Sequence, residues 1–195
     1  MAKLHFKYGA MNSGKTDTLI KTAYNYSENG LRPVVVKPAV DTKGKAQIVA
    51  RAGGKRDVDI LADESTDLHR QILKLKQRAD VDVVLIDEAQ FLTPAQIDQL
   101  YEIAKQENIS VICYGLRADF MTNLFPGSRR LFEVADNIEK LPTMCLCGAQ
   151  AEFNCRQIDG KFVFTGEQVA IDGEGAVTYT SLCGNCRTKE LLAQK

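Results

Sequence analysis

The feature that most constrains this chain is an eight-residue stretch near its start, which has the form G-x-x-x-x-G-K-[ST]. Its members are Gly9, Ala10, Met11, Asn12, Ser13, Gly14, Lys15 and Thr16. The spacing of apolar residues predicts a strand over residues 3–8 before it and a helix over residues 15–28 after it. A glycine-rich turn in that setting directs backbone N–H groups, and the positive end of the helix dipole, at an anion. The sequence therefore predicts a phosphate-binding loop at residues 9–16, called the phosphate loop below.

The last two residues of the phosphate loop carry the side chains that a nucleoside triphosphate needs. We expect Lys15 to reach the β- and γ-phosphates and the Thr16 hydroxyl to ligate Mg²⁺. The alternative is a chance match in a glycine-containing turn. Four specified positions with the correct flanking elements favour a site for a nucleoside triphosphate.

A second motif lies where a hydrophobic strand ends in acidic residues. Residues 81–86 are rich in β-branched side chains and are followed by Asp87, Glu88, Ala89 and Gln90, called the acidic box below. A strand that ends in a carboxylate is the Walker B pattern, and open α/β folds bind their ligands at that edge of the sheet. We expect Asp87 to hold Mg²⁺, directly or through water, and Glu88 is a candidate general base. An acidic pair without function is the alternative, which the phosphate loop disfavours.

The order of the elements predicts the fold class. Further strands are expected at residues 34–36 and 109–115, and further helices at residues 65–78, 93–107 and 127–136. This alternation favours an α/β fold, a P-loop NTPase-like parallel sheet flanked by helices on both faces. Residues 38–56 contain three glycines and five basic residues and are expected to form a long mobile loop. The loop is a flap near the phosphates, a subunit contact or a solvated segment.

Four cysteines in the last third of the chain predict a metal site. Cys145 and Cys147 form a C-x-C pair, and Cys183 and Cys186 form a C-x-x-C pair. Two such pairs indicate a tetrahedral structural Zn²⁺ site, and two disulfides are the alternative. We therefore expect two domains, an α/β domain over residues 1–142 and a small zinc-ribbon domain over residues 143–195. The polar residues 187–195 are expected to be disordered, and strand-like segments are expected at residues 162–169 and 177–179.

Composition narrows the class of protein. The 25 basic and 25 acidic residues among 195 cancel, which gives no support for a strongly basic nucleic-acid-binding protein. The apolar runs fall short of the ~18 residues that a membrane helix needs. The first residues lack the basic-then-apolar layout of a signal peptide. We expect a cytoplasmic protein with no membrane partner, in which the six cysteines stay reduced or bind metal.

Three classes of function fit a phosphate loop, an acidic box and a Cys₄ ribbon. The first is a small kinase that phosphorylates a small molecule held beneath the ribbon. The second is an ATP-driven nucleic-acid motor, because the acidic box resembles a helicase motif and zinc ribbons often contact nucleic acid. The third is a nucleotide-dependent switch. A helicase needs two tandem motor domains, so the length favours the kinase, and Glu88 beside Asp87 disfavours a non-catalytic switch.

The chain resembles the type II thymidine kinases, the cytosolic-type enzymes widespread in bacteria. The likeness rests on the phosphate loop, residues 87–91, residues 114–120 and the paired cysteines, and it covers about residues 3–190. It implies transfer of the γ-phosphoryl group of ATP to the 5′-hydroxyl of thymidine, giving dTMP for nucleotide salvage and DNA synthesis, with deoxyuridine as a further substrate. It also implies a homotetramer and feedback inhibition by dTTP.

The same resemblance assigns roles to individual residues. It makes Glu88 the base that accepts the proton of the 5′-hydroxyl, and it places ATP and Mg²⁺ on the phosphate loop and the acidic box. Phe120 matches the aromatic residue that packs on the thymine ring. The matches to the lasso loop, which covers the nucleoside and binds the base largely through main-chain groups, are Gln168, Val169, Ala170, Ile171, Asp172 and Tyr179.

Overall fold

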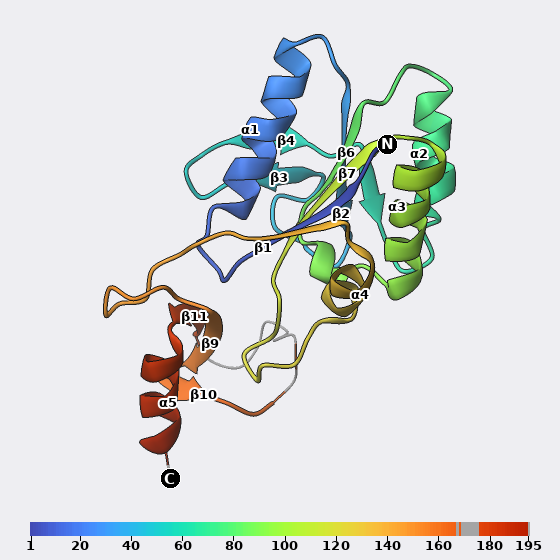
Figure 1. Ribbon diagram of the computed structural model, residues 1–195. Helices are drawn as coiled ribbons and strands as arrows, with labels where there is room; N and C mark the ends of the chain where they lie inside the picture. Colours follow the sequence, from blue (N-terminus) through green and yellow to red (C-terminus); the bar gives the residue numbers. More distant parts are fainter. Residues whose placement is uncertain (167, 169–175, 195) are drawn as a thin grey trace.

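The computed structural model describes residues 1–166, 168 and 176–194, and its main element is a parallel sheet (Figure 1). The strand order is β5-β2-β6-β7-β1-β8, and every neighbouring pair is parallel. The strands are β1 (Leu4–Tyr8), β2 (Pro33–Pro38), β5 (Ile60–Ala62), β6 (Val83–Ile86), β7 (Ser110–Gly115) and β8 (Asn137–Lys140). The parallel α/β fold predicted from the sequence is confirmed, although the short strands β5 and β8 were not predicted.

Helices cover both faces of this sheet (Figure 1). They are α1 (Lys15–Glu28), α2 (Leu68–Lys76), α3 (Pro94–Gln106) and α4 (Pro126–Val134). Val35 packs in the apolar layer beneath α1, whereas Val34 and Val36 pack in the layer formed by the other three helices. A strand buried on both faces needs no polar alternation, which explains the continuous valine run. A capping box begins α3, since Thr93 and Gln96 bond reciprocally.

The parallel arrangement brings four segments to one edge of the sheet. The phosphate loop follows β1, residues 39–41 follow β2, the acidic box follows β6, and residues 116–120 follow β7. Because the carboxyl ends of parallel strands share an edge, all four segments meet there. The residues predicted to bind phosphate and those predicted to bind Mg²⁺ therefore lie together, although about seventy positions separate them in the sequence.

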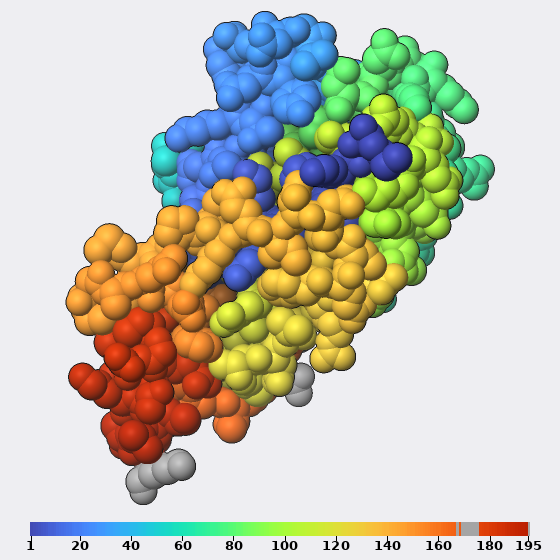
Figure 2. Space-filling view, in the orientation of Figure 1, coloured from blue at the N-terminus to red at the C-terminus, as the bar shows by residue number. Residues whose placement is uncertain are grey.

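A smaller antiparallel sheet forms a lobe at one end of the molecule, orange to red in Figure 2. Its strands are β9 (Phe153–Ile158), β10 (Lys161–Val163) and β11 (Val177–Leu182), in the order β10-β9-β11. The expectation of strand structure through residue 169 is wrong as far as the described residues go, because β10 ends at Val163 and residues 164–166 and 168 lie outside strands. Among the described residues, no helix is long and apolar enough to cross a membrane.

The predicted disordered tail is a helix over most of its length. Helix α5 spans Gly184–Leu192, and the Sγ of Cys183 caps it by accepting a hydrogen bond from the backbone N–H of Cys186 at 3.5 Å. The Arg187 guanidinium lies over the rings of Phe153 and Phe164, 5.4 Å from each centroid. This polar sequence can be helical because the Cys183 cap fixes its first turn and the contacts of Arg187 with the two rings attach it to the small sheet.

The predicted mobile loop over residues 38–56 contains a hairpin instead. Strands β3 (Gln47–Val49) and β4 (Lys55–Asp57) pair antiparallel, and Ile48 is buried in the layer beneath α1. The fully buried ammonium of Lys37 donates to the carbonyl oxygens of Lys43, Lys45 and Gln47. A buried lysine requires such acceptors, so the valine-rich strand β2 anchors the segment that follows it.

A close approach of two backbones fixes the acidic box. The first turn of α4 lies against the short 3₁₀ helix η1 (Ala89–Phe91), so that a Cβ atom on Gly127 would lie 2.5 Å from the carbonyl oxygen of Ala89 and 2.7 Å from that of Leu92. Backbone atoms cannot yield as a flexible side chain does. Only glycine at this position allows α4 to support the segment that follows Glu88.

We predict that Gly127→Ala lowers the free energy of unfolding by about 1–3 kcal/mol, because the added methyl group overpacks against backbone. Urea denaturation followed by circular dichroism measures the change. Gly184→Ala is the matched control, since among the described residues its Cβ would meet only the Phe153 ring, at 3.7 Å. Equal unfolding midpoints for the two variants would contradict the overpacking argument.

Candidate active site

The phosphate loop holds two residues in the left-handed backbone region. Gly14 has φ 73° and caps α1, and Asn12 has φ 67°. Glycine adopts this conformation without strain and asparagine tolerates it better than most residues. The loop is thus a tight turn that delivers the chain into the first turn of α1, as the sequence motif predicts.

The ammonium group of Lys15 lies inside this turn. Its Nζ donates to the carbonyl oxygens of Gly9 at 3.1 Å and Ala10 at 3.0 Å, and to Ser13 Oγ at 3.3 Å. Burial lowers the pKa of Lys15, while the charges of Glu88 and Asp87 act in the opposite direction. A largely desolvated cation at the start of α1 interacts strongly with any anion that reaches it.

Thr16 and Asp87 come from different segments and meet at the sheet edge. The Thr16 hydroxyl donates to Asp87 Oδ2 at 3.1 Å. Burial, with the nearby charge of Glu88, raises the pKa of Asp87 to about 7. A hydroxyl and a carboxylate are hard oxygen donors of the kind that Mg²⁺ prefers. A divalent cation would also offset the free-energy cost of burying the Asp87 charge. This pair could therefore hold the metal.

Glu88 is held in an unusual conformation beside this pair. Its φ of 48° and ψ of 39° are left-handed, which is rare for a residue with a side chain. Gln90 Nε2 donates to Glu88 Oε2 at 2.6 Å, and Gln90 Oε1 accepts from the backbone N–H of Leu116 at 3.0 Å. The buried amide of Gln90 thus ties the carboxylate to the segment after β7. Strain that the surroundings maintain in this way is common at functional positions.

A cavity of about 850 Å³ joins these groups to the small sheet. The phosphate loop and Glu88 line one part of it, while Phe91, Phe120 and Phe125 contribute aromatic rings. Tyr179 from β11 and Gln168 also line it. The volume lies within the range of about 300–1,000 Å³ usual for small-molecule sites. The space can hold a polyphosphate at one part and a planar ring at another.

Three residues expected to bind the nucleoside contact the side chain of Arg156, which the sequence analysis did not identify. The Arg156 guanidinium covers one face of Phe120, 3.8 Å from the ring centroid, and Arg156 Nε donates to the Tyr179 hydroxyl at 2.9 Å. Arg156 also donates to the Gln168 carbonyl at 3.1 Å, and Gln168 Nε2 donates to Asp119 Oδ2 at 3.0 Å. Phe120, Gln168 and Tyr179 are therefore brought together, as expected.

Some predicted residues cannot be placed, and others were not predicted. Val169, Ala170, Ile171 and Asp172 lie outside the described residues. The cavity is also lined by Asp41, Lys43, Arg51 and Asn154, which the motifs did not identify. Asp41 follows the carboxyl end of β2, so the rule that located Asp87 would have located it too. Arg51 donates to the Asn12 side chain, which brings the hairpin segment to the phosphate loop.

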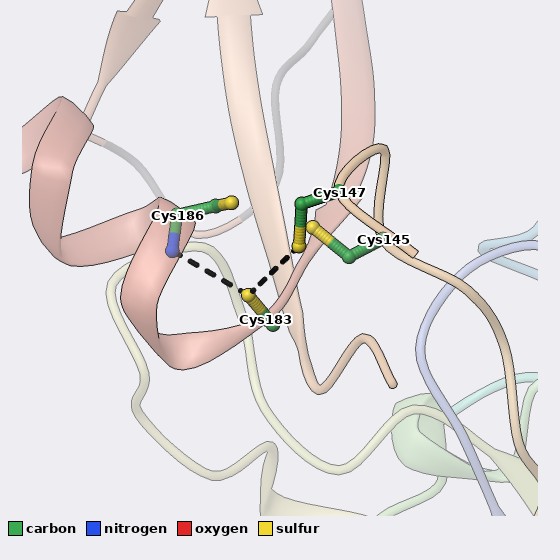
Figure 3. Close-up of side chains that lie close together, drawn as sticks. All are labelled: Cys145, Cys147, Cys183 and Cys186. Carbon is green, nitrogen blue, oxygen red and sulfur yellow. Dashed lines mark hydrogen bonds between the residues drawn. The ribbon is translucent and has the colours of Figure 1, made fainter. Parts of the chain in front are cut away.

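The four paired cysteines converge in the small lobe (Figure 3). Their sulfur atoms all lie within 4.8 Å of one another, and Cys147 Sγ is 3.7 Å from Cys183 Sγ. Tetrahedral Zn²⁺ with Zn–S bonds of about 2.3 Å requires S–S separations of about 3.8 Å. Backbone N–H groups of Cys147 and Cys183 lower the pKa of the Cys145 thiol to about 6, whereas hydrogen bonds with the other three thiols raise the pKa of Cys186 to about 12, so the four sulfur groups interact closely. The set fits a structural Zn²⁺.

The sheet, the phosphate loop and the carboxylates at one sheet edge define a P-loop nucleotide-binding protein. The sequence profile of the family described as thymidine kinase matches residues 2–187. Thymidine kinases of Photobacterium profundum, Pasteurella multocida and Haemophilus influenzae are 41%, 40% and 40% identical to the chain over 185 residues. These matches cover 94% of the chain and 95%, 95% and 94% of the three relatives. The chain belongs to the thymidine kinase family.

We predict that purified protein contains about one zinc ion per chain. Cys186→Ala should lose the metal and lower the thermal unfolding midpoint, because three remaining thiolates bind zinc weakly and the small lobe depends on it. Elemental analysis and calorimetry measure the two effects. Cys113→Ala, which alters a buried thiol of β7 outside the cysteine cluster, should keep its zinc. A parent protein without zinc would contradict the assignment.

Proposed function

We propose that this chain is a thymidine kinase, which transfers the γ-phosphoryl group of ATP to the 5′-hydroxyl of thymidine to give dTMP and ADP. Deoxyuridine is proposed as a further substrate. The observation that carries the proposal is the cavity lined by Glu88, the phosphate loop and the aromatic residues together. Membership of the thymidine kinase family supports the choice of substrates.

In the proposed reaction, the phosphate loop binds the triphosphate. Its backbone N–H groups and Lys15 hold the phosphates at the N-terminus of α1. Thr16 and Asp87 would hold Mg²⁺, which would supply positive charge beside the transferred group. Ala89 and Gln90 complete the acidic box. Gln90 Nε2 orients the Glu88 carboxylate through the 2.6 Å hydrogen bond.

Glu88 is proposed to act as the general base. The 5′-oxygen attacks the γ-phosphorus in line, its bond to phosphorus forms as the bond to the β-phosphate oxygen breaks, and ADP leaves. The proton of the 5′-hydroxyl passes to Glu88. A base contributes only if it lies within hydrogen-bond reach of that hydroxyl, so the maintained backbone conformation of Glu88 matters more than its intrinsic basicity.

The aromatic part of the cavity is proposed to hold the base. The Arg156 guanidinium stacks on one face of the Phe120 ring and also lies over the Tyr179 ring. A supported ring offers a flat apolar surface for thymine. Gln168 and residues 169–172 are proposed to close over the nucleoside as a lasso, with main-chain groups binding the base.

The architecture suggests how these parts are organised. We propose that residues 1–142 form the nucleotide-binding domain and that residues 143–195 form a zinc-binding domain carrying the lasso. A structural Zn²⁺ bound by the cysteine cluster stabilises a sheet of three short strands, which is too small to bury much core alone. A cytoplasmic location is proposed, in keeping with six cysteines that are not joined in disulfides.

The test of the proposed function is ADP release from ATP and Mg²⁺ in the presence of different acceptors. Thymidine should stimulate release strongly and deoxyuridine should stimulate it too, with the nucleoside monophosphate as the second product. Single-stranded nucleic acid should not stimulate it. Release that depends only on nucleic acid would replace the kinase with the motor interpretation.

We predict that Glu88→Gln lowers kcat by about 10²- to 10⁴-fold while the Kd for ADP stays within about twofold of the parent, because the amide keeps the shape but cannot accept the proton. Steady-state kinetics and titration calorimetry measure the two quantities. Glu102→Gln, on the exposed side of α3, is the matched control and should behave as the parent. Near-normal turnover of Glu88→Gln would remove Glu88 from the role of base.

Two properties are proposed from the family resemblance alone. The chain is expected to form a homotetramer, with a light-scattering mass of about four chains. dTTP is expected to inhibit the reaction competitively with thymidine, because its base and sugar match those of the substrate. A monomeric mass, or inhibition unaffected by thymidine concentration, would contradict the respective proposal.

A further inference from the structure

Two side chains of the small sheet bind the backbone N–H and the backbone carbonyl of one residue of the phosphate loop, Met11. The backbone N–H of Met11 donates to Asn154 Oδ1 at 2.7 Å, and the Met11 carbonyl accepts from Ser181 Oγ at 2.7 Å. Both partners are nearly inaccessible to solvent, with exposed fractions of 6% for Asn154 and 7% for Ser181. Buried hydrogen bonds of this kind are costly to leave unmade.

The two partners are neighbours in the small sheet. Asn154 on β9 and Ser181 on β11 lie directly opposite each other in the antiparallel register. Their neighbours along the chain belong to the small core, since Cys155 follows Asn154, and Leu182 and Cys183 follow Ser181. The position of the pair is therefore set by the strand register and by the cysteine cluster, whose member Cys183 lies two residues beyond Ser181.

Met11 lies in the part of the phosphate loop where the backbone turns through a left-handed residue. It precedes Asn12, whose φ of 67° is left-handed, and the Ser13 N–H donates to the Ala10 carbonyl across the turn at 3.3 Å. A turn of this kind persists when surrounding contacts over-determine it. Asn154 Nδ2 also donates to the Ala118 carbonyl at 3.4 Å, which links the same pair to the segment bearing Phe120.

We propose that Asn154 and Ser181 are positioning residues for the phosphate loop, so that the small zinc-binding sheet sets the geometry of the triphosphate site as well as that of the nucleoside site. The Met11 N–H is committed to Asn154, and the pair acts by orienting the N–H groups that follow Met11. This inference rests on the proposed function of the loop as a phosphate site.

Ser181→Ala is the sharper probe because Ser181 does not belong to the cavity lining, whereas Asn154 does. Removal of the hydroxyl should weaken ADP binding, measured without nucleoside, on the order of fivefold. The KM for ATP should rise accordingly while the KM for thymidine changes less than about twofold. Ser181→Thr, which retains the hydroxyl, should recover most of the affinity.

The control for the strand itself is Thr178→Ala. Thr178 is an exposed residue of the same strand, and its hydroxyl donates to Gln157 at 3.3 Å rather than to the phosphate loop. This variant should bind ADP as the parent does. Asn154→Ala supplies a second probe if Ser181→Ala folds poorly, and combining the two changes should weaken binding by less than the product of the single effects, because both act on one residue of the loop.

The outcomes separate the inference from the proposed function. A parent protein that binds no ADP would overturn the phosphate site itself. A parent that binds ADP, together with folded, zinc-loaded Ser181→Ala and Asn154→Ala proteins that bind it equally well, would overturn the positioning role alone. A lower unfolding midpoint with unchanged ADP affinity would also overturn the positioning role, since it reflects stability only.

Discussion

The concentration of buried charge at one edge of the parallel sheet is the constraint on which the rest of the site depends. Lys15 and Asp87 are almost fully buried, with exposed fractions of 7% and 4%. Burial lowers the pKa of Lys15 and raises the pKa of Asp87, so it disfavours the charged form of both. Such a site is unfavourable for the protein alone and becomes favourable when a polyphosphate and its cation supply the missing charges.

The remaining structure maintains this arrangement. Gln90 and Gly127 hold the segment around Glu88, one through a buried amide and the other by allowing two backbones to meet. The small sheet contacts the site through Met11 and through the Arg156–Phe120 stack. Transfer of a phosphoryl group depends mainly on positioning and charge, so rigid support from two sheets suits the proposed chemistry.

The sequence predicted the parallel sheet, its four flanking helices, the phosphate loop, the Thr16–Asp87 meeting and the cysteine cluster. These features follow from local patterns and from one topological rule, that parallel strands share their carboxyl edge. The hairpin was missed because its anchor is a single buried lysine, Lys37, inside a valine-rich strand. Helix α5 was missed because tertiary contacts of Arg187, rather than an apolar stripe, attach it to the small sheet.

Long-range polar contacts were beyond sequence reasoning. Met11 is separated from Asn154 by 143 positions and from Ser181 by 170. These bonds join a side chain to a backbone group. Neither the periodicity of apolar residues nor the spacing of motifs predicts such a bond. Arg156 was missed for a similar reason, since its partners Phe120 and Tyr179 lie on segments that only the folded chain brings together.

Direct phosphoryl transfer is tested by following the γ-phosphoryl group itself. Protein incubated with ATP carrying a radioactive phosphorus label at the γ-position, Mg²⁺ and thymidine should move the label into dTMP, at a rate that matches ADP formation and with little label in inorganic phosphate. Equal rates mean that the cavity aligns the nucleoside and the triphosphate for direct transfer. Label that appears in inorganic phosphate whether or not thymidine is present would rule out a kinase, because the site would then be a hydrolase.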